Sequence, residues 1–355
     1  MQAIPVDEAR LNAFVGHMLG DLGAAMGASL VLVGDKLGLY KALAEAGPMS
    51  STALAGRTAT NERMVREWLA AQAAAGYVDY DPADDRYSLS PEQAMVFAEE
   101  ESPVFLAGFF DIVAAAIRGE DKVTEAFRTG RGVGWHEQHR CLFCGTERFF
   151  RTSYQHHLVQ EWIPALDGVA AKLERGGTVA DVGCGHGAST IVMARAFPDA
   201  RFAGFDYHAP SIEAARAAAR EAHLGDRVTF EVAAAKHFPG SGYDLVTFFD
   251  CLHDMGDPAG AAAHVRDALA PDGTWMIVEP MAGDRLADNL NPVGRIYYAA
   301  STMICTPASM SQEVGLALGA QAGQARLRAV VTGAGFSRFR EAIATPFNMV
   351  LEARP

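Results

Sequence analysis

The sequence predicts an α/β protein in which a doubly wound sheet follows a helical N-terminal part. From Thr178 onward, short apolar runs alternate with amphipathic helical segments, as in parallel strands covered by helices on both faces. Before residue 100, helical segments are followed by two short strand-like pieces, which is the pattern of a winged helix. The 355 residues suffice for two domains. We expect a winged-helix domain at residues 1–100, a helical linker and pocket cover at 101–166, and the sheet domain at 167–355.

The N-terminal elements follow from helix and turn signals. Asn61 is a good N-cap for a helix that Gly76 closes, and Gly47-Pro48 ends an earlier amphipathic helix. An aspartate-rich turn at residues 81–85 separates the two strand-like pieces. The predicted helices and strands are Lys36–Ala46, Thr52–Arg57, Glu62–Ala75, Tyr77–Tyr80 and Arg86–Leu89.

Charge argues against a nucleic-acid partner. The formal net charge is −13, and Arg63 and Arg66 of the third helix are accompanied by two glutamates. A helix that reads DNA carries clustered positive charge instead. The winged-helix domain is therefore expected to be a dimerisation platform for a homodimer. An early helix at Val15–Leu32, rich in Leu, Met, Val and Ala, would otherwise expose an apolar face.

The sequence also predicts a cytoplasmic protein without a membrane span. The N-terminus shows no basic stretch followed by an apolar core and a small-residue cleavage site. The most apolar early stretch, Leu22–Tyr40, is interrupted by Asp35 and Lys36 and lacks the ~20 uninterrupted apolar residues of a span. Five cysteines are a sparse and odd set, which is typical of reduced thiols.

The C-terminal elements are read from the alternating pattern. Helices are expected to begin near Ala188, Ser211 and Pro258. Two closing pieces, Arg338–Ile343 and Asn348–Ala353, are predicted to form a terminal antiparallel pair. The five strands before them are predicted at Thr178–Val182, Arg201–Phe205, Val228–Val232, Leu245–Phe249 and Thr274–Val278.

A glycine-rich loop joins the first of these strands to the next helix. Gly183, Gly185 and Gly187 let the backbone turn tightly and approach a ligand that a Cβ would block. The following strand ends in Asp206, about where an acidic residue hydrogen-bonds a ribose diol. The combination predicts a site for a nucleoside-containing cofactor at Val179–Thr190.

The same loop also fits a dinucleotide fingerprint, because Gly183, Gly185 and Ala188 satisfy G-x-G-x-x-A. Three further features favour S-adenosylmethionine over NAD. Asp181 lies two residues before the first glycine, where its carboxylate can meet the amino group of a bound amino acid. The glycines alternate, and a terminal antiparallel pair is wrong for a parallel dinucleotide fold. An NAD-dependent oxidoreductase stays as an alternative, as does a winged-helix transcriptional regulator that responds to a ligand.

Val179–Gly187, Asp206 and the segment Tyr243–Asp254 resemble the successive motifs of class I S-adenosylmethionine-dependent methyltransferases. With its winged-helix half, nearly the whole chain resembles the small-molecule O-methyltransferases that dimerise through such a domain. It is similar to a bacterial group of methyltransferases sometimes labelled regulators. The resemblance implies a Rossmann-like seven-stranded methyltransferase sheet, S-adenosylmethionine as methyl donor and S-adenosylhomocysteine as product. The motifs specify the donor but not the acceptor.

The resemblance also places the cofactor along the glycine loop. Gly183 and Gly185 pack on its methionine portion, and Asp206 holds both ribose hydroxyls. The family often has an aspartate that contacts adenine where this chain has Ala234, which leaves adenine recognition to the backbone of the next two residues. The complete predicted cofactor set is Asp181, Gly183, Cys184, Gly185, Asp206, Tyr207, Ala235, Lys236, Phe249, Asp250 and Tyr154.

Methyl transfer to a hydroxyl group requires an aligned acceptor and a group that removes the proton. His253 is the candidate base, because histidine titrates near neutrality and a catalytic histidine occupies the matching His-Asp position in plant-type O-methyltransferases. The alternative is that His253-Asp254 only arranges the turn before the helix capped by Asp257. Asp250 and Glu279, also at strand ends, are expected to orient His253, to bind the acceptor, or to serve the fold.

An insertion at residues 281–323 is longer than a βα connection needs and is expected to form a helical lid. Asn291-Pro292 opens a helix whose aromatic residues suit an acceptor wall, although ordinary helix packing or a dimer contact explains them equally well. A loop near Gly130–Gly145 is expected to gate the acceptor pocket. The predicted pocket residues are Trp135, His139, Phe149, Tyr297, Tyr298 and Met303.

Metal-ligand spacings occur at His136, His139, Cys141 and Cys144, which follow H-x-x-H and C-x-x-C. Four ligands crowded into this short segment would be geometrically awkward, so the sequence predicts no metal there. The function predicted from the whole sequence is methyl transfer to oxygen, or less often nitrogen or carbon, of a small apolar or aromatic acceptor.

Overall fold

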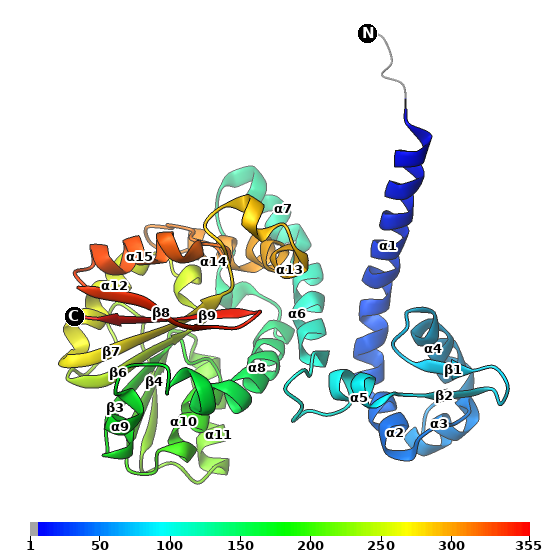
Figure 1. Ribbon diagram of the computed structural model, residues 1–355, viewed down its shortest axis with the longest axis horizontal. Coiled ribbons are helices and arrows are strands. Elements are labelled where there is room, and N and C mark those ends of the chain that lie inside the picture. Colours follow the sequence, from blue (N-terminus) through cyan, green and yellow to red (C-terminus); the bar gives the residue numbers. More distant parts are fainter. Residues whose placement is uncertain (1–5) are drawn as a thin grey trace. The chain divides into compact units, whose positions relative to one another are not determined.

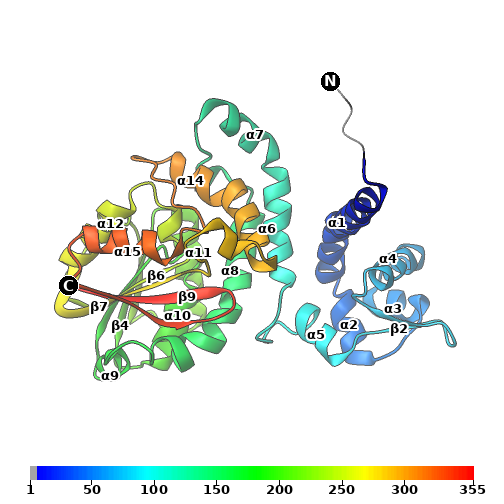
Figure 2. The same cartoon turned by 45° about the horizontal axis from the view of Figure 1, so that its top comes forward.

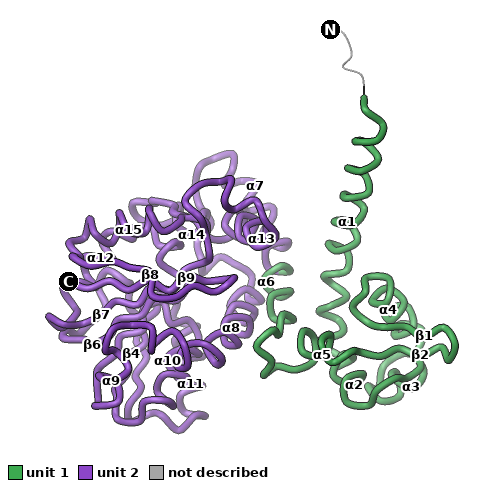
Figure 3. Tube along the Cα trace, in the orientation of Figure 1, with its two compact units in different colours: residues 1–114 green, residues 115–355 purple. Residues whose placement is uncertain are grey.

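The computed structural model describes residues 6–355 and divides into two compact units, Met1–Ala114 and Ala115–Pro355 (Figure 3). The first unit carries a bundle of helices with a two-stranded hairpin, and the second carries a seven-stranded sheet (Figure 1). Helix α6 (Ala107–Arg118) contains the boundary between them.

The first unit has the helix, helix, helix, hairpin order of a winged helix, as predicted. Its core is aromatic, since the Tyr40 ring packs edge-on against Trp68 and stacks on Phe97, with centroids 5.0 and 4.9 Å away. The Tyr40 hydroxyl donates to Gln72 Oε1 at 2.5 Å, which satisfies a buried amide. The elements are α1 (Glu8–Lys36), α2 (Leu39–Ala46), α3 (Ser51–Thr58), α4 (Glu62–Ala74), β1 (Asp79–Asp81), β2 (Arg86–Ser88) and α5 (Pro91–Phe97).

Helix boundaries in this unit follow local backbone chemistry. The side chain of Asn61 accepts from Met64 N at 3.2 Å, which confirms it as the cap of α4. The helix predicted at Lys36–Ala46 ends as predicted but begins later, at Leu39, because Lys36 is the last residue of α1. Between the two helices Gly38 adopts φ +67°, a left-handed conformation that side chains disfavour.

Helix α1 is 29 residues long and buries side chains only near its C-terminal end. By length and composition it is apolar enough to cross a membrane, with a mean hydropathy of 1.3 and 17% of its most apolar window buried. Core helices of soluble proteins and N-terminal signal sequences meet the same criterion. Of its five glycines, the four before the last turns would bring no Cβ within 4 Å of another group: Gly16, Gly20, Gly23 and Gly27.

The second unit contains a mixed sheet with strand order β5-β4-β3-β6-β7-β9-β8. Strands β3 to β7 pair in parallel, whereas β9 is antiparallel to both of its neighbours. The predicted terminal antiparallel pair is therefore confirmed. The strands are β3 (Thr178–Val182), β4 (Arg201–Asp206), β5 (Val228–Val232), β6 (Tyr243–Phe249), β7 (Leu269–Pro280), β8 (Arg338–Ala344) and β9 (Asn348–Arg354).

Helices cover both faces of this sheet, with α9, α10 and α11 on one face and α12 and α15 on the other (Figures 1 and 2). Each face has its own apolar core, and neighbouring residues of β3 serve different cores because side chains alternate along a strand. Val179 thus packs in the α10 core, and Ala180 packs in the α12 core. The bounds are α9 (Val169–Glu174), α10 (Ala188–Ala196), α11 (Ala209–Glu221), α12 (Pro258–Ala268) and α15 (Gly323–Gly333).

Two helical segments other than those that cover the sheet contain π-helical turns. Helix α8 (Cys141–Ser153) continues as the π-helix η2 (Tyr154–Trp162), so the loop predicted through Gly145 ends earlier than expected. The insertion at 281–323 is helical, as predicted. Its elements are η4 (Leu286–Asn289), α13 (Pro292–Ala300), the π-helix η5 (Ser301–Cys305) and α14 (Thr306–Met310). The remaining short elements are α7 (Glu120–Thr129), η1 (Trp135–Glu137) and η3 (Leu252–Asp254).

Candidate functional site

A cavity of about 380 Å³ lies at the carboxyl ends of β3, β4 and β6. Parallel sheets place ligands at this edge, where the loops of neighbouring strands converge. Among the predicted cofactor residues, Asp181 does not line the cavity. The others do, namely Gly183, Cys184, Gly185, Asp206, Tyr207, Ala235, Lys236, Phe249, Asp250 and Tyr154.

The glycine loop has a backbone that side chains would not tolerate. Gly183 has φ +74°, and a Cβ there would meet Cys251 Sγ at 2.7 Å. Gly187 has φ +81°, and a Cβ there would meet the Phe230 ring at 2.6 Å. Gly185, at φ +52°, faces open space, so its lack of a side chain leaves room beside the cavity.

Asp206 fastens the end of β4 to the glycine loop. One carboxylate oxygen accepts from Gly185 N at 3.0 Å, and the other accepts from His208 N at 2.8 Å. Burial raises the pKa of Asp206, and these two backbone bonds lower it in part. Each oxygen keeps acceptor capacity toward the cavity, which suits a ligand carrying two neighbouring hydroxyls.

Asp181 lies beneath the loop rather than in the cavity. It is 1% exposed, and its carboxylate accepts from Ser189, Thr190 and Thr247 hydroxyls at 2.7, 2.6 and 3.0 Å. Burial raises the pKa of Asp181 in spite of these three bonds. In this structure its carboxylate therefore ties β3 to α10 and β6 and lies outside the cavity lining.

We expect Asp181→Ala to lower the free energy of unfolding by about 3 kcal/mol or more, because three buried hydroxyls lose their acceptor. Urea unfolding followed by circular dichroism measures this loss. Asp181→Asn is the matched control, since its amide oxygen still accepts, and it should lose less. If the Asp181→Ala protein is fully stable but no longer binds S-adenosylhomocysteine, Asp181 contributes to the cofactor site and not to stability.

One face of α8 and its continuation forms a wall of the cavity. Phe143, Glu147, Phe150 and Tyr154 line it, and their spacing of four, three and four residues places them on a single helical face. Phe143 stacks on His208 with centroids 4.5 Å apart, and Trp135 packs edge-on against Phe143 at 5.6 Å.

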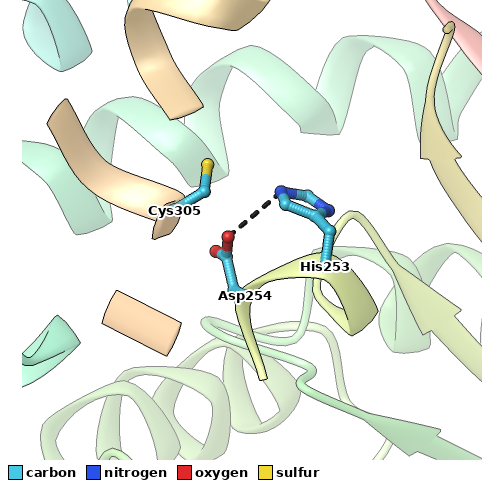
Figure 4. A group of neighbouring side chains, drawn as sticks. All are labelled: His253, Asp254 and Cys305. Atoms are coloured by element: carbon cyan, nitrogen blue, oxygen red, sulfur yellow. Dashed lines mark ion pairs between the residues drawn. The ribbon is translucent and has the colours of Figure 1, made fainter. Parts of the chain in front are cut away.

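His253 lies in a buried cluster of carboxylates beside the cavity. It is 3% exposed; its Nδ1 is 2.5 Å from Glu279 Oε2, and its Nε2 is 3.1 Å from Asp254 Oδ1 (Figure 4). Burial disfavours the imidazolium, but Glu279 and Asp254 outweigh it and raise the pKa of His253 well above its ordinary value of 6.5. Asp254 lines the cavity, whereas His253 and Glu279 do not.

Asp250 follows β6 with a left-handed backbone at φ +49°. Its Oδ1 accepts from Asn348 Nδ2 at 2.8 Å, and its Oδ2 is buried with no hydrogen-bond partner among the described residues. Burial and the nearby Glu279 raise the pKa of Asp250 well above 3.8. A strained, incompletely satisfied carboxyl group of this kind is typical of ligand sites.

The predicted acceptor residues are only partly gathered at the cavity. Trp135 lines it, and Phe150 lies there in place of the neighbouring Phe149. The Tyr297 hydroxyl donates to Phe347 O at 2.9 Å, away from the lining. The remaining predicted residues His139, Tyr298 and Met303 also lie outside the lining, and the lid contributes Ala308, Gln312 and Glu313 instead.

The zinc-like spacing at residues 136–144 does not form a ligand cluster among the described residues. The Arg118 guanidinium lies 3.3 Å from Cys141 Sγ and 3.4 Å from His139 Nδ1.

Two family models match the chain. A methyltransferase domain matches residues 173–326, and an Rv2258c-like winged HTH domain matches residues 24–99. The mitomycin biosynthesis 6-O-methyltransferase of Streptomyces lavendulae is 25% identical over 281 residues, covering 75% of this chain and 77% of that protein. The 27-O-demethylrifamycin SV methyltransferase of Amycolatopsis mediterranei is 30% identical over 131 residues, covering 35% of this chain and 48% of that protein.

Solved structures share the fold over the whole chain. An O-methyltransferase family protein from Burkholderia thailandensis superimposes with a TM-score of 0.69 at 15% identity, covering 99% of both chains. Human N-acetylserotonin methyltransferase in complex with S-adenosylmethionine gives a TM-score of 0.67 at 17% identity, covering 100% of this chain and 99% of that one. The chain therefore joins an N-terminal winged-helix domain to a methyltransferase domain, the arrangement on which S-adenosylmethionine-dependent methyl transfer rests.

Proposed function

We propose that the protein transfers the methyl group of S-adenosylmethionine to a hydroxyl group of a small, largely apolar acceptor. The observation that carries this proposal is a single cavity that joins the glycine loop and Asp206 to an apolar wall containing Phe143, Phe150 and Met255. A site that is mostly apolar with a few polar groups suits a small organic ligand. The names of both curated relatives specify transfer to oxygen.

The residues present suit the methyl donor. A loop without side chains at Gly183 and Gly185 leaves space for the amino-acid portion, and the Asp206 carboxylate retains acceptor capacity for two ribose hydroxyls. The donor supplies an activated methyl group on its sulfonium. Asp250, beside this loop, offers a carboxyl oxygen without a protein partner and is proposed to face the methionine end.

We assign proton removal to the pair of Asp254 and His253. Asp254 lines the cavity and adjoins His253 Nε2, so the proton of the acceptor hydroxyl reaches the imidazole through this carboxylate. Glu279 holds Nδ1 and thereby fixes the orientation of the ring. The aromatic α8 wall keeps water from the apolar end and aligns the acceptor for in-line attack.

The direct test is calorimetry followed by an acceptor screen. Purified protein should bind S-adenosylhomocysteine and not NADH, and incubation with S-adenosylmethionine and a panel of phenolic acceptors should yield products heavier by one methylene group. Binding of NADH with no binding of S-adenosylhomocysteine would contradict the proposal.

We further propose that the protein acts in the cytoplasm as a homodimer held by the first unit. All five cysteines are free thiols, which suits a reducing compartment. Helix α1 exposes large apolar side chains along one side, including Leu19 at 64%, Leu22 at 58% and Met26 at 78%. A second copy of this chain would cover them. Arg63 and Arg66 of α4 pair with Glu67 and Glu62, which leaves little free positive charge for DNA.

Leu22→Glu should convert the dimer to monomer, because a charge would lie in the apolar contact. Multi-angle light scattering at micromolar concentration measures the change. Ala24→Glu is the matched control, since Ala24 is exposed on the opposite side of α1 and should leave the dimer intact. A wild-type monomer would overturn the proposal, and flotation of wild-type protein with phospholipid vesicles would point to a membrane as the cover of α1.

A further inference from the structure

Beside the cavity, three donor atoms of different chemistry converge on one point. His253 Nε2, a carboxylate oxygen of Asp254 and Cys305 Sγ lie within 4.8 Å of one another (Figure 4). They come from two separate elements, η3 and the π-helix η5, so the lid brings the thiol to the strand-end pair. Imidazole, carboxylate and thiolate are the three ligand types that zinc prefers in proteins.

The distances between the donor atoms suit a tetrahedrally coordinated ion. Zinc–nitrogen and zinc–oxygen bonds of about 2.1 Å require ligand atoms about 3.4 Å apart, and zinc–sulfur bonds of about 2.3 Å require only slightly more. His253 Nε2 and Asp254 Oδ1 are 3.1 Å apart. Side-chain adjustments of about an ångström or less would complete the geometry at Sγ.

The surroundings also favour a cation. Glu279 accepts from His253 Nδ1 at 2.5 Å, which is the carboxylate–histidine arrangement that directs the other ring nitrogen toward a metal. Among the described residues, Asp254 and Glu279 form ion pairs only with His253. The group therefore contains two carboxylates and one imidazole, a charge balance that favours a cation. The zinc-like spacing at residues 136–144 differs, because two of its donors, His139 and Cys141, lie close to the Arg118 guanidinium.

The thiol is enclosed together with the other two donors. Cys305 is 8% exposed, and its Sγ lies within 4.8 Å of the ligand atoms of His253 and Asp254. Asp254 lines the cavity, which gives an ion and a water molecule as fourth ligand a route to the group.

We propose that His253, Asp254 and Cys305 form a binding site for a divalent, thiolate-preferring cation such as zinc, and that the bound ion inhibits methyl transfer. Zinc replaces the protons on Nε2 and Sγ, which pass to the buffer. The inhibition rests on the proposed function, because Nε2 is the atom assigned to proton removal; binding of the ion does not.

The test titrates metal-free full-length protein with zinc in a calorimeter and measures the zinc retained after desalting. Wild type should retain one equivalent. Cys305→Ala and Cys305→Ser should each weaken binding by about 100-fold or more, because a direct ligand contributes more than the outer partners that cost 10–100-fold. Cys144→Ser removes an exposed thiol outside the group and should bind as wild type does.

Cobalt gives a readout that does not depend on activity. Wild-type protein loaded with cobalt should show a thiolate-to-metal charge-transfer band that both Cys305 variants lack. Melting temperature and S-adenosylhomocysteine binding establish that the variants are folded. Equal zinc affinity in wild type and Cys305→Ser, or a cobalt complex without the thiolate band, would overturn the site. Zinc that binds at Cys305 without slowing turnover would overturn the inhibition alone.

Discussion

His253→Gln is expected to lower the turnover number by about 10²- to 10⁴-fold, the usual contribution of a positioned acid–base group. Glutamine fills a similar volume and can still hydrogen-bond, so the buried cluster should persist. S-adenosylhomocysteine affinity should stay within about twofold of wild type, because His253 does not line the cavity. Single-turnover rates with a methylated-product assay measure the effect. A His253→Gln enzyme with full turnover would leave the ring a purely structural role.

The pH dependence gives an independent readout of the same group. Neutral imidazole is the active form, and the pKa of His253 is raised well above 6.5 by Glu279 and Asp254. The rate should therefore fall as pH decreases through this raised value, and the rising limb should lie on the alkaline side of 6.5. Glu279→Gln removes one of the raising charges and should move the limb to lower pH. A limb at or below pH 6.5 in wild type would contradict the assignment.

Asp206→Ala is expected to weaken S-adenosylhomocysteine binding by about 100-fold or more. Each hydrogen bond from a ribose hydroxyl to a carboxylate contributes about 1.5–3 kcal/mol, and 1.4 kcal/mol is a factor of ten. Calorimetry measures the dissociation constant directly. The carboxylate also accepts from Gly185 N and His208 N, so the alanine variant loosens the loop as well.

Asp206→Asn is an intermediate variant. Its amide oxygen keeps one of the two loop bonds, but the amide nitrogen cannot accept from the second backbone N–H, and the charge is lost. It should melt between wild type and Asp206→Ala and bind S-adenosylhomocysteine with intermediate affinity. If Asp206→Ala binds within about threefold of wild type, the ribose is held elsewhere and the placement of the cofactor is wrong.

The sheet and the glycine loop were predictable because their signals are local. The alternation of strands and helices, the positive-φ glycines and the acid at the end of β4 all depend on neighbours within about twenty residues. Asp181 shows the limit of that reasoning. Its carboxylate finds Ser189, Thr190 and Thr247, and the last of these lies on a different strand. The position of Asp181 relative to the first glycine in the sequence does not predict such partners.

The residues at the acceptor end of the cavity were harder to predict for a related reason. Because a loop was predicted through Gly145, the first turn of α8 was not recognised as helical. The spacing that places Phe143 and Tyr154 on one helical face was therefore missed. In the lid, Met303 lies in the π-helix η5, where a turn holds more residues than in an α-helix, so its face does not follow from helical spacing. Residues such as Gln312 reach the cavity through loop geometry that no periodic pattern encodes.

The four interior glycines of α1 have a consequence for how the chain assembles. Each costs up to about 1 kcal/mol of helix stability relative to alanine, so together they remove roughly 3–4 kcal/mol from a helix whose first half has few contacts of its own. If the proposed second copy covers α1, its order depends on protein concentration by mass action, and its N-terminal turns would unwind on dilution while the second unit stays folded.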